Sequence, residues 1–223
     1  MIAWPGTGKE TNVPLPDHSG HEPQAGKAST GLQTPRETRV TTILLIGKLM
    51  SRHGEALCRI RNLSSGGLMA EVHVPLHEDD PVQIELKAGD QLAGSVRWTR
   101  EGRLGIAFDE PIDVAAMLAR ATVKTAAQGL VRAPRFAVDC LAELRSDGRR
   151  HTGRLVNLSQ GGARVEADFE PEEAKLLILA IPGLPERRGA VRWVGNGAIG
   201  LSFLEPLAFE ELGLWLVEQQ GKV

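Results

Sequence analysis

The chain has 223 residues, 42% of them hydrophobic, with 26 Lys and Arg against 28 Asp and Glu and a formal net charge of −2. This length suits one or two domains with packed cores. The balanced charge argues against DNA or RNA as a partner, because nucleic acids are bound through many phosphate contacts from a basic surface. No apolar run is long enough to span a membrane, so we expect no membrane span.

The first segment, residues 1–33, is rich in Gly, Pro, Thr, Ser and His and has few apolar residues to bury. It also lacks the apolar core of a signal peptide. We therefore predict a disordered N-terminal tail. The chain has two cysteines, Cys58 and Cys140, which are not equivalent in the repeat described next. Reduced thiols in a cytoplasmic protein are the expected state.

The rest of the chain carries one sequence pattern twice, 95 positions apart. Asn-Leu-Ser-x-Gly-Gly, Val-Arg-Trp and Glu-Pro each occur in both halves without a change of spacing between them. A register held this long predicts two copies of one domain, which we place at 34–128 and 129–223. The repeated pieces are 62–67 and 157–162, then 96–98 and 191–193, then 110–111 and 205–206.

Within each copy, apolar and polar residues alternate along short segments separated by turns rich in glycine. This period of two is typical of antiparallel strands with one buried face. We predict an all-β fold of two tandem six-stranded barrels, each followed by a C-terminal α-helix. In the first copy the expected strands are Val40–Leu49, Ala56–Arg61, 68–74, 82–87, 92–99 and 103–108, and the expected helices of the two copies are 111–128 and 206–219. Trp98 and Trp193 fall on apolar faces and are predicted to lie in the cores.

Two polar features recur in both copies. The Asn-x-Ser-x-x-Gly turn fits a tight turn between strands, and it also fits a surface that holds a polar planar ligand. An arginine pair precedes the first strand, Arg36 and Arg39 in one copy and Arg132 and Arg135 in the other. Arginine matches the geometry of phosphate and of the guanine edge, although a short basic cluster is commonly just solvated. Both interpretations stay open from the residues alone.

The ordered series of arginine pair, Asn-x-Ser-x-x-Gly turn, Val-x-Trp and Gly-x-x-Phe resembles the PilZ domain family over nearly all of the chain outside its tail. The resemblance implies a receptor for the bacterial second messenger cyclic di-GMP, which acts as a ligand and not as a cofactor. In that family the arginines hold guanine edges and phosphates, and the turn closes on the other side of the ligand. The binding residues that this implies are Arg36, Arg39, Asn62, Ser64 and Gly67 in the first copy and Arg132, Arg135, Asn157, Ser159 and Gly162 in the second.

Both copies depart from the family pattern at the arginines. The family usually has three residues between the two arginines, whereas here two intervene. The loop then either shifts by one residue or loses one ligand contact. A bidentate arginine–guanine contact is worth roughly 1–3 kcal/mol, so such a loss would weaken binding by about tenfold to a hundredfold. Each turn also begins with Asn, where the family often has Asp.

We expect no enzymatic activity, because no catalytic set recurs in both copies. We also expect no metal site, since His73 and His77 flank Pro75 near a strand end. One alternative to the receptor is a PilZ-like protein that has lost nucleotide binding and serves as a scaffold for a protein partner. A second, an RNA-binding barrel, lacks the basic face and exposed aromatic residues that it would need.

Overall fold

The computed structural model describes residues 45–86, 89–120 and 133–221. The predicted tail, the Arg36–Arg39 pair and Arg132 therefore lie outside the described residues. Glu37–Val223 forms one compact unit by its contacts.

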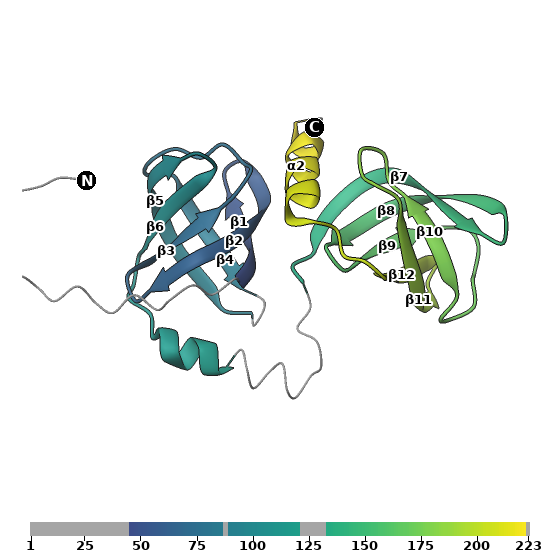
Figure 1. Cartoon of the computed structure of the whole chain (residues 1–223), viewed down its shortest axis with the longest axis horizontal. Helices are drawn as coiled ribbons and strands as arrows, with labels where there is room; N and C mark the ends of the chain where they lie inside the picture. The colour runs from purple at the N-terminus through teal and green to yellow at the C-terminus, as the bar shows by residue number, and fades with distance from the viewer. Residues whose placement is uncertain (1–44, 87–88, 121–132, 222–223) are drawn as a thin grey trace, which may run out of the picture. The chain divides into compact units, whose positions relative to one another are not determined.

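Within the described residues, twelve strands form two closed antiparallel barrels of six strands each (Figure 1). The strand order around each barrel is the same, β1-β2-β3-β6-β5-β4 in the first and β7-β8-β9-β12-β11-β10 in the second. The predicted fold class is confirmed. The strands of the first barrel are β1 (Leu45–Ser51), β2 (Gly54–Ser64), β3 (Gly67–Glu71), β4 (Pro81–Leu86), β5 (Gln91–Arg100) and β6 (Arg103–Phe108), and those of the second are β7 (Phe136–Ser146), β8 (Arg149–Ser159), β9 (Gly162–Glu166), β10 (Leu176–Ala180), β11 (Arg187–Gly195) and β12 (Ala198–Phe203).

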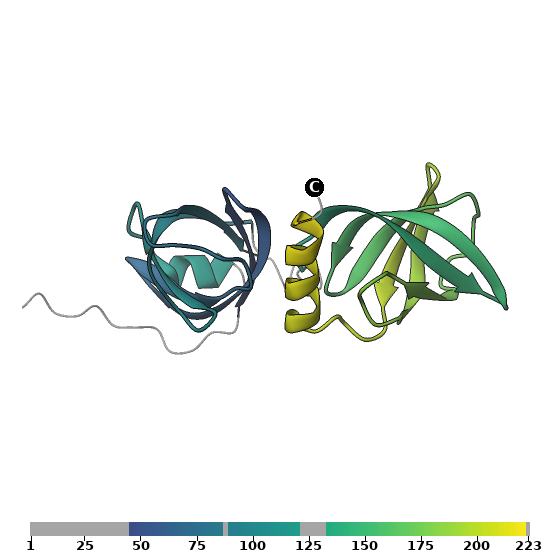
Figure 2. The same ribbon diagram turned by 90° about the horizontal axis from the view of Figure 1, so that it is seen from above.

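The alternation seen in the sequence fills the inside of each barrel with aliphatic side chains. Figure 2 shows the first barrel as a ring of strands. Its interior residues Leu49, Ile60, Ile84 and Val96 have no exposed surface. Because every strand has a partner on both sides, closure leaves no edge for pairing with another chain. Side chains of the second barrel that are buried to the same degree include Leu144, Leu155, Val165 and Ile199.

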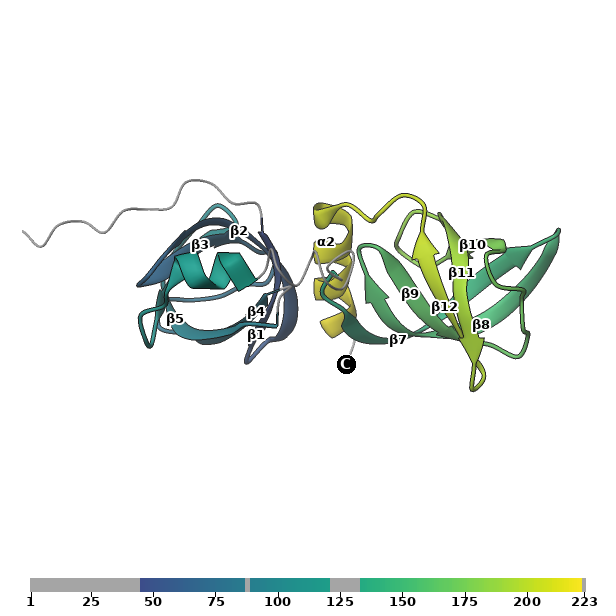
Figure 3. The same cartoon turned by 90° about the horizontal axis from the view of Figure 1, so that it is seen from below.

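A short helix follows the first barrel and lies at one of its ends (Figures 1 and 3). Residues 114–120 are helical, and the remainder of the predicted helix lies outside the described residues. Asp113 starts it, since the Asp113 carboxylate accepts a hydrogen bond from Ala116 N–H at 2.9 Å. Val114 and Met117 are buried in the core of the first barrel. This helix therefore contributes to the barrel core.

The second barrel is followed by α2 (Phe209–Gln220), as the repeat predicts. The helix begins at Phe209 and not at Pro206, because the intervening backbone bonds to the β8–β9 turn. Leu207 N–H donates to the Gln160 carbonyl at 2.8 Å, and the Gln160 amide donates to the Leu207 carbonyl at 3.1 Å. Trp215 is buried in the core of the second barrel and its indole N–H donates to the Pro182 carbonyl at 2.8 Å.

The outward side of α2 also contacts β2 within the compact unit. Glu210 forms an ion pair with Arg59 at 3.2 Å, and the same guanidinium lies 4.1 Å from the ring centroid of Phe209. Val217 packs against the core of the first barrel. A single helix thus shares contacts with residues of both barrels.

No helix among the described residues is both long enough and apolar enough to cross a membrane. Cys58 is fully buried beside Gly47, and burial raises the pKa of its thiol to about 12. Such a thiol stays protonated and unreactive at neutral pH.

Candidate ligand-binding surface

The Asn-x-Ser-x-x-Gly turn joins β2 to β3 in the first barrel and β8 to β9 in the second. The Ser64 hydroxyl donates a hydrogen bond to the Gly67 carbonyl at 3.0 Å, and Ser159 does the same to Gly162 at 3.1 Å. Each serine hydroxyl therefore stabilises the turn of its own hairpin. The two turns are built alike, and part of the motif has a purely structural role.

The last glycine of the motif is required by a close approach between strands. A Cβ atom on Gly67 would collide with the carbonyl oxygen of Ile106 on β6, and one on Gly162 would collide with that of Leu201. Gly66, one position earlier, faces open space. Gly67 therefore allows β3 to pair tightly with β6, and this explains its place in both copies.

The same turn is hydrogen-bonded to the segment that leads into the following helix. The Gly66 carbonyl accepts from Phe108 N–H at 3.0 Å, and the Ser65 carbonyl accepts from Ile112 N–H at 2.9 Å. A shift of the turn would thus act directly on the chain between the barrel and the helix. The second copy repeats this arrangement with Phe203 N–H to Gly161 at 2.9 Å and Leu207 N–H to Gln160 at 2.8 Å.

Trp98 and Trp193 lie on the outer surface, so their prediction as core residues is wrong. Their exposed fractions are 40% and 38%. Each follows a β-bulge, because Arg97 and Arg192 have no paired residue on the neighbouring strand. One extra residue reverses the alternation beyond it and turns the indole outward.

Each exposed tryptophan covers a glycine on the adjacent strand. Trp98 is paired with Gly105, and a Cβ atom on that glycine would collide with the indole ring. Trp193 and Gly200 stand in the same relation. The indoles therefore lie against the outer face of β6 and β12, where their position is fixed by the strand beneath them.

An open pocket of about 320 Å³ lies between the turn and the Trp98 indole on the outer face of the first barrel. Asn62 faces this pocket because a bulge in β2 follows Ile60 and places Asn62 opposite Met69. Its walls offer an amide side chain, a guanidinium, an indole and the exposed backbone of a glycine turn. The lining residues are Asn62, Ser64, Gly66, Gly67, Leu68, Met69, Arg97, Trp98, Gly105, Ile106 and Ala107.

The second barrel differs in charge at one position of this surface. Arg164 stands where the first barrel has Met69, and it pairs across the sheet with Asn157. The Arg164 guanidinium carbon lies 5.9 Å from the centroid of the Trp193 ring. This distance is within the range of a cation–π contact. The second surface therefore carries an additional positive charge between its amide and its indole.

Of the four predicted arginines, Arg135 is the one within the described residues. It is exposed and immediately precedes Phe136, which pairs with Leu158 at the start of β7. The backbone of Arg135 thus lies beside the Asn157–Gly162 turn, where the chain begins strand β7. In the first barrel the chain also enters β1 at this end, because Leu45 pairs with Ile60.

Arg61, next to Asn62, was not singled out from the sequence. Its guanidinium donates to the Glu71 carboxylate at 2.8 Å, and Arg59 and Arg103 also pair with Glu71. The hydrogen bond from Arg61 is the main reason that the pKa of Glu71 lies below its usual range. Arg61 is therefore held by a carboxylate at the edge of the turn.

The model of the PilZ domain matches this chain twice, over residues 33–124 and over residues 130–214. Together the two segments include more than half of the sequence. The chain belongs to the PilZ domain family. The two matched segments correspond to the two barrels, each with its Asn-x-Ser-x-x-Gly turn.

Solved structures similar to this tandem PilZ protein include the Borreliella burgdorferi PlzA protein in complex with c-di-GMP, at 14% identity and a TM-score of 0.39, over 83% of this chain and 94% of that chain. Escherichia coli YcgR in complex with c-di-GMP has 10% identity and a TM-score of 0.32, over 80% and 86%. The Bacillus subtilis inhibitor of motility MotI has 14% identity and a TM-score of 0.32, over 82% and 99%. No match was found among curated proteins.

The exposed tryptophans and Arg164 are the residues of this PilZ surface that the sequence reasoning missed. A signal for the tryptophans was present, because a tryptophan and a glycine recur on neighbouring strands at the same spacing in both copies. Arg164 had no such signal, since it breaks the repeat. Its place beside Asn157 is set by the sheet register.

Proposed function

We propose that this protein is a receptor for cyclic di-GMP, with one binding surface on each barrel. The observation that carries the proposal is a duplicated arrangement. In both barrels an Asn-x-Ser-x-x-Gly turn lies at the end where the chain enters the first strand, next to an exposed tryptophan. The PilZ family resemblance supplies the ligand, and the chemistry of the surface fits it.

Each group on the surface has a counterpart in a cyclic purine dinucleotide. The Asn62 amide can both donate to and accept from a guanine edge, and the Trp98 indole offers an aromatic face. Arg135, with Arg36, Arg39 and Arg132 outside the described residues, would supply guanidinium groups for the phosphates and for guanine. The short Arg-x-x-Arg spacing leads us to expect weaker binding than a full set of contacts would give.

The proposed response begins at the turn. A ligand that contacts Asn62 and the Gly66 backbone would shift or fix the carbonyls of Ser65 and Gly66. Those carbonyls hold Phe108 and Ile112, which lead to the following helix. The second barrel has the equivalent bonds, and its helix α2 also contacts β2. Ligand binding would thereby change the contacts that α2 makes. This change would alter a surface that binds a protein partner.

The rival function is a scaffold that binds a protein partner without nucleotide. One observation favours it: Ser64 and Gly67 have structural roles in the hairpin and would be retained without a ligand. The rival therefore predicts a folded protein that does not respond to cyclic di-GMP.

Calorimetric titration of matched variants tests the proposal. Arg135→Ala and Asn157→Ala should each weaken the second site by about tenfold or more, since each removes a contact of roughly 1–3 kcal/mol. Arg100→Ala is the control, because Arg100 is an exposed arginine on β5 that does not line the pocket. Equal binding by the Arg135→Ala and Arg100→Ala proteins would contradict the assigned site.

A further inference from the structure

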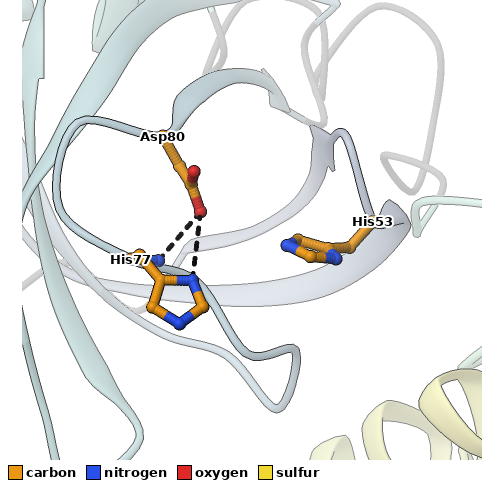
Figure 4. A group of neighbouring side chains, drawn as sticks. All are labelled: His53, His77 and Asp80. Atoms are coloured by element: carbon orange, nitrogen blue, oxygen red, sulfur yellow. Dashed lines mark hydrogen bonds and ion pairs between the residues drawn. The ribbon is translucent and has the colours of Figure 1, made fainter.

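Two histidines and a carboxylate converge at the other end of the first barrel. His53 comes from the β1–β2 turn, and His77 and Asp80 come from the loop between β3 and β4 (Figure 4). One ligand atom of each residue lies within 4.8 Å of those of the other two. Because successive strands are antiparallel, this end is opposite the β2–β3 turn. None of the three residues lines the proposed nucleotide pocket.

Asp80 is the fixed member of the group. Its side chain is only 7% exposed, and its carboxylate accepts a hydrogen bond from His77 N–H at 2.8 Å. The His77 ring nitrogen Nδ1 lies 3.8 Å from the same carboxylate oxygen. The carboxylate is thus held in place with two imidazoles beside it.

A cation already occupies part of this space. The Arg52 guanidinium forms an ion pair with Asp80 at 3.1 Å and donates a hydrogen bond to a His53 ring nitrogen at 3.1 Å. The Arg52 side chain is 59% exposed, so it can turn into solvent without leaving a cavity. The two groups that Arg52 now contacts are the kinds of group that bind a metal ion.

The second barrel shows which part of the group is a general feature of the fold. The positions equivalent to Arg52 and Asp80 are Asp147 and Lys175, which form an ion pair with the charges exchanged. An ion pair between this turn and this loop is therefore common to both barrels. The histidines are not, since the positions equivalent to His53 and His77 are Gly148 and Glu172. A role in joining the two loops therefore does not explain the presence of the two histidines.

We propose that His53, His77 and Asp80 form a divalent transition-metal site, with Zn²⁺ as the best fit. Two imidazole nitrogens and one carboxylate oxygen are a common three-residue Zn²⁺ ligand set, with solvent in the fourth position. Imidazole ligands favour Zn²⁺, Cu²⁺ or Ni²⁺ over Ca²⁺ and Mg²⁺, which prefer oxygen ligands. The metal takes the place of the Arg52 guanidinium and joins the β1–β2 turn to the β3–β4 loop.

His73, which the sequence places near His77, is not part of the site. Its ring centroid lies 5.4 Å from that of Phe209 in the contact with α2. The proposal does not depend on cyclic di-GMP binding, because none of the three proposed metal ligands lines the nucleotide pocket. Failure of one proposal would leave the other standing.

Titration of the chelator-treated full-length protein with Zn²⁺, followed by calorimetry and thermal unfolding, tests the site. We expect saturable binding of one ion and a rise in melting temperature, since a ligand that binds the folded state alone stabilises it. Mg²⁺ at the same concentration should produce neither effect. Visible absorption of Co²⁺ in place of Zn²⁺ should report imidazole and carboxylate ligation.

Four variants decide which residues bind. His53→Ala and His77→Ala should each weaken Zn²⁺ binding by about tenfold or more, because even the loss of a residue that only orients a metal ligand typically weakens metal affinity by about that factor. Arg52→Ala should tighten binding, because it removes the competing cation. His151→Ala is the control, since His151 stacks on Phe169 in the second barrel.

Two results would overturn the proposal. One is the absence of saturable Zn²⁺ binding to the folded wild-type protein. The other is undiminished binding by both the His53→Ala and His77→Ala proteins, which would point to other groups such as His18 and His21 near the N-terminus. Both histidines of the cluster are exposed, so neither variant is expected to unfold the barrel.

Discussion

The indole of Trp98 covers Gly105 on the outer face of the first barrel, and it is held there by the bulge at Arg97. Trp193 and Gly200 repeat the relationship in the second barrel. A large aromatic ring with about two-fifths of its surface exposed, next to an open pocket, is well placed to stack on a base.

Trp98→Ala should weaken cyclic di-GMP binding to the first barrel by about tenfold or more. Stacking of a base on an aromatic side chain is worth about 1–3 kcal/mol. Because the ring lies outside the core, the variant should keep its fold, which circular dichroism can check. Thr99→Ala is the control, since Thr99 is exposed on the same strand but does not line the pocket. If calorimetry finds the same affinity in both variants, the indole does not stack on the ligand.

The glycines of the turn should differ in their tolerance of a methyl group. Gly67→Ala places a Cβ against the Ile106 carbonyl and should lower the free energy of unfolding by about 1–3 kcal/mol, the usual cost of overpacking. Gly66→Ala meets open space and should stay within about 0.5 kcal/mol of wild type. Urea denaturation compares the two. Equal effects would mean that the β3–β6 approach is not the reason for Gly67.

Much of the fold could be predicted from the sequence because the repeat and the strand alternation are both local, periodic signals. Alternation across Val82, Ile84 and Leu86 predicts a strand that is observed. The same logic failed at Trp98, because one extra residue at Arg97 reverses every later position. A bulge depends on the pairing of two strands and cannot be read from one of them.

The candidate site could be predicted in part for a related reason. The turn residues Asn62 and Ser64 are recognisable because turn chemistry is encoded within six consecutive positions. The role of Arg164 depends on its cross-strand partner Asn157, and the metal cluster depends on two loops that meet in space. The first depends on the register of the β8–β9 hairpin, and the second on loops that are separated in the sequence by two strands.

Arg164 should make the two nucleotide surfaces unequal. Arg164→Met, which gives the second barrel the residue of the first, should weaken its binding by about tenfold if the guanidinium contacts a phosphate or a base. The reciprocal change, Met69→Arg, should strengthen the first site. Calorimetry at two salt concentrations provides the measurement, because the arginine contribution should decrease with added salt. No change in either variant would exclude Arg164 from the site.

Glu71 should link stability to pH. The hydrogen bond from Arg61, with the charges of Arg59 and Arg103, lowers its pKa below the ordinary value of 4.5. A carboxyl group with a lowered folded-state pKa stabilises the protein above its unfolded pKa, and the contribution is lost as the pH falls through the folded-state value. Glu71→Gln should therefore reduce the melting temperature at neutral pH, and the difference from wild type should close in acid.

The repeat offers a matched control for Glu71. Glu166 is the equivalent residue of the second barrel, where its ion pair with Arg154 is 3.9 Å long and its side chain is 43% exposed. Glu166→Gln should have a smaller effect. A Glu71→Gln deficit that stays constant from neutral to acidic pH would show that the lost contribution is not the ionised carboxylate.

Calorimetric titration of the folded wild-type protein with cyclic di-GMP tests the central claim most directly, with GMP as the control ligand. We predict saturable binding at both barrels of each chain, with tighter binding at the second barrel than at the first. The absence of binding heat at high micromolar cyclic di-GMP, on protein shown to be folded, would contradict the receptor function and favour the scaffold.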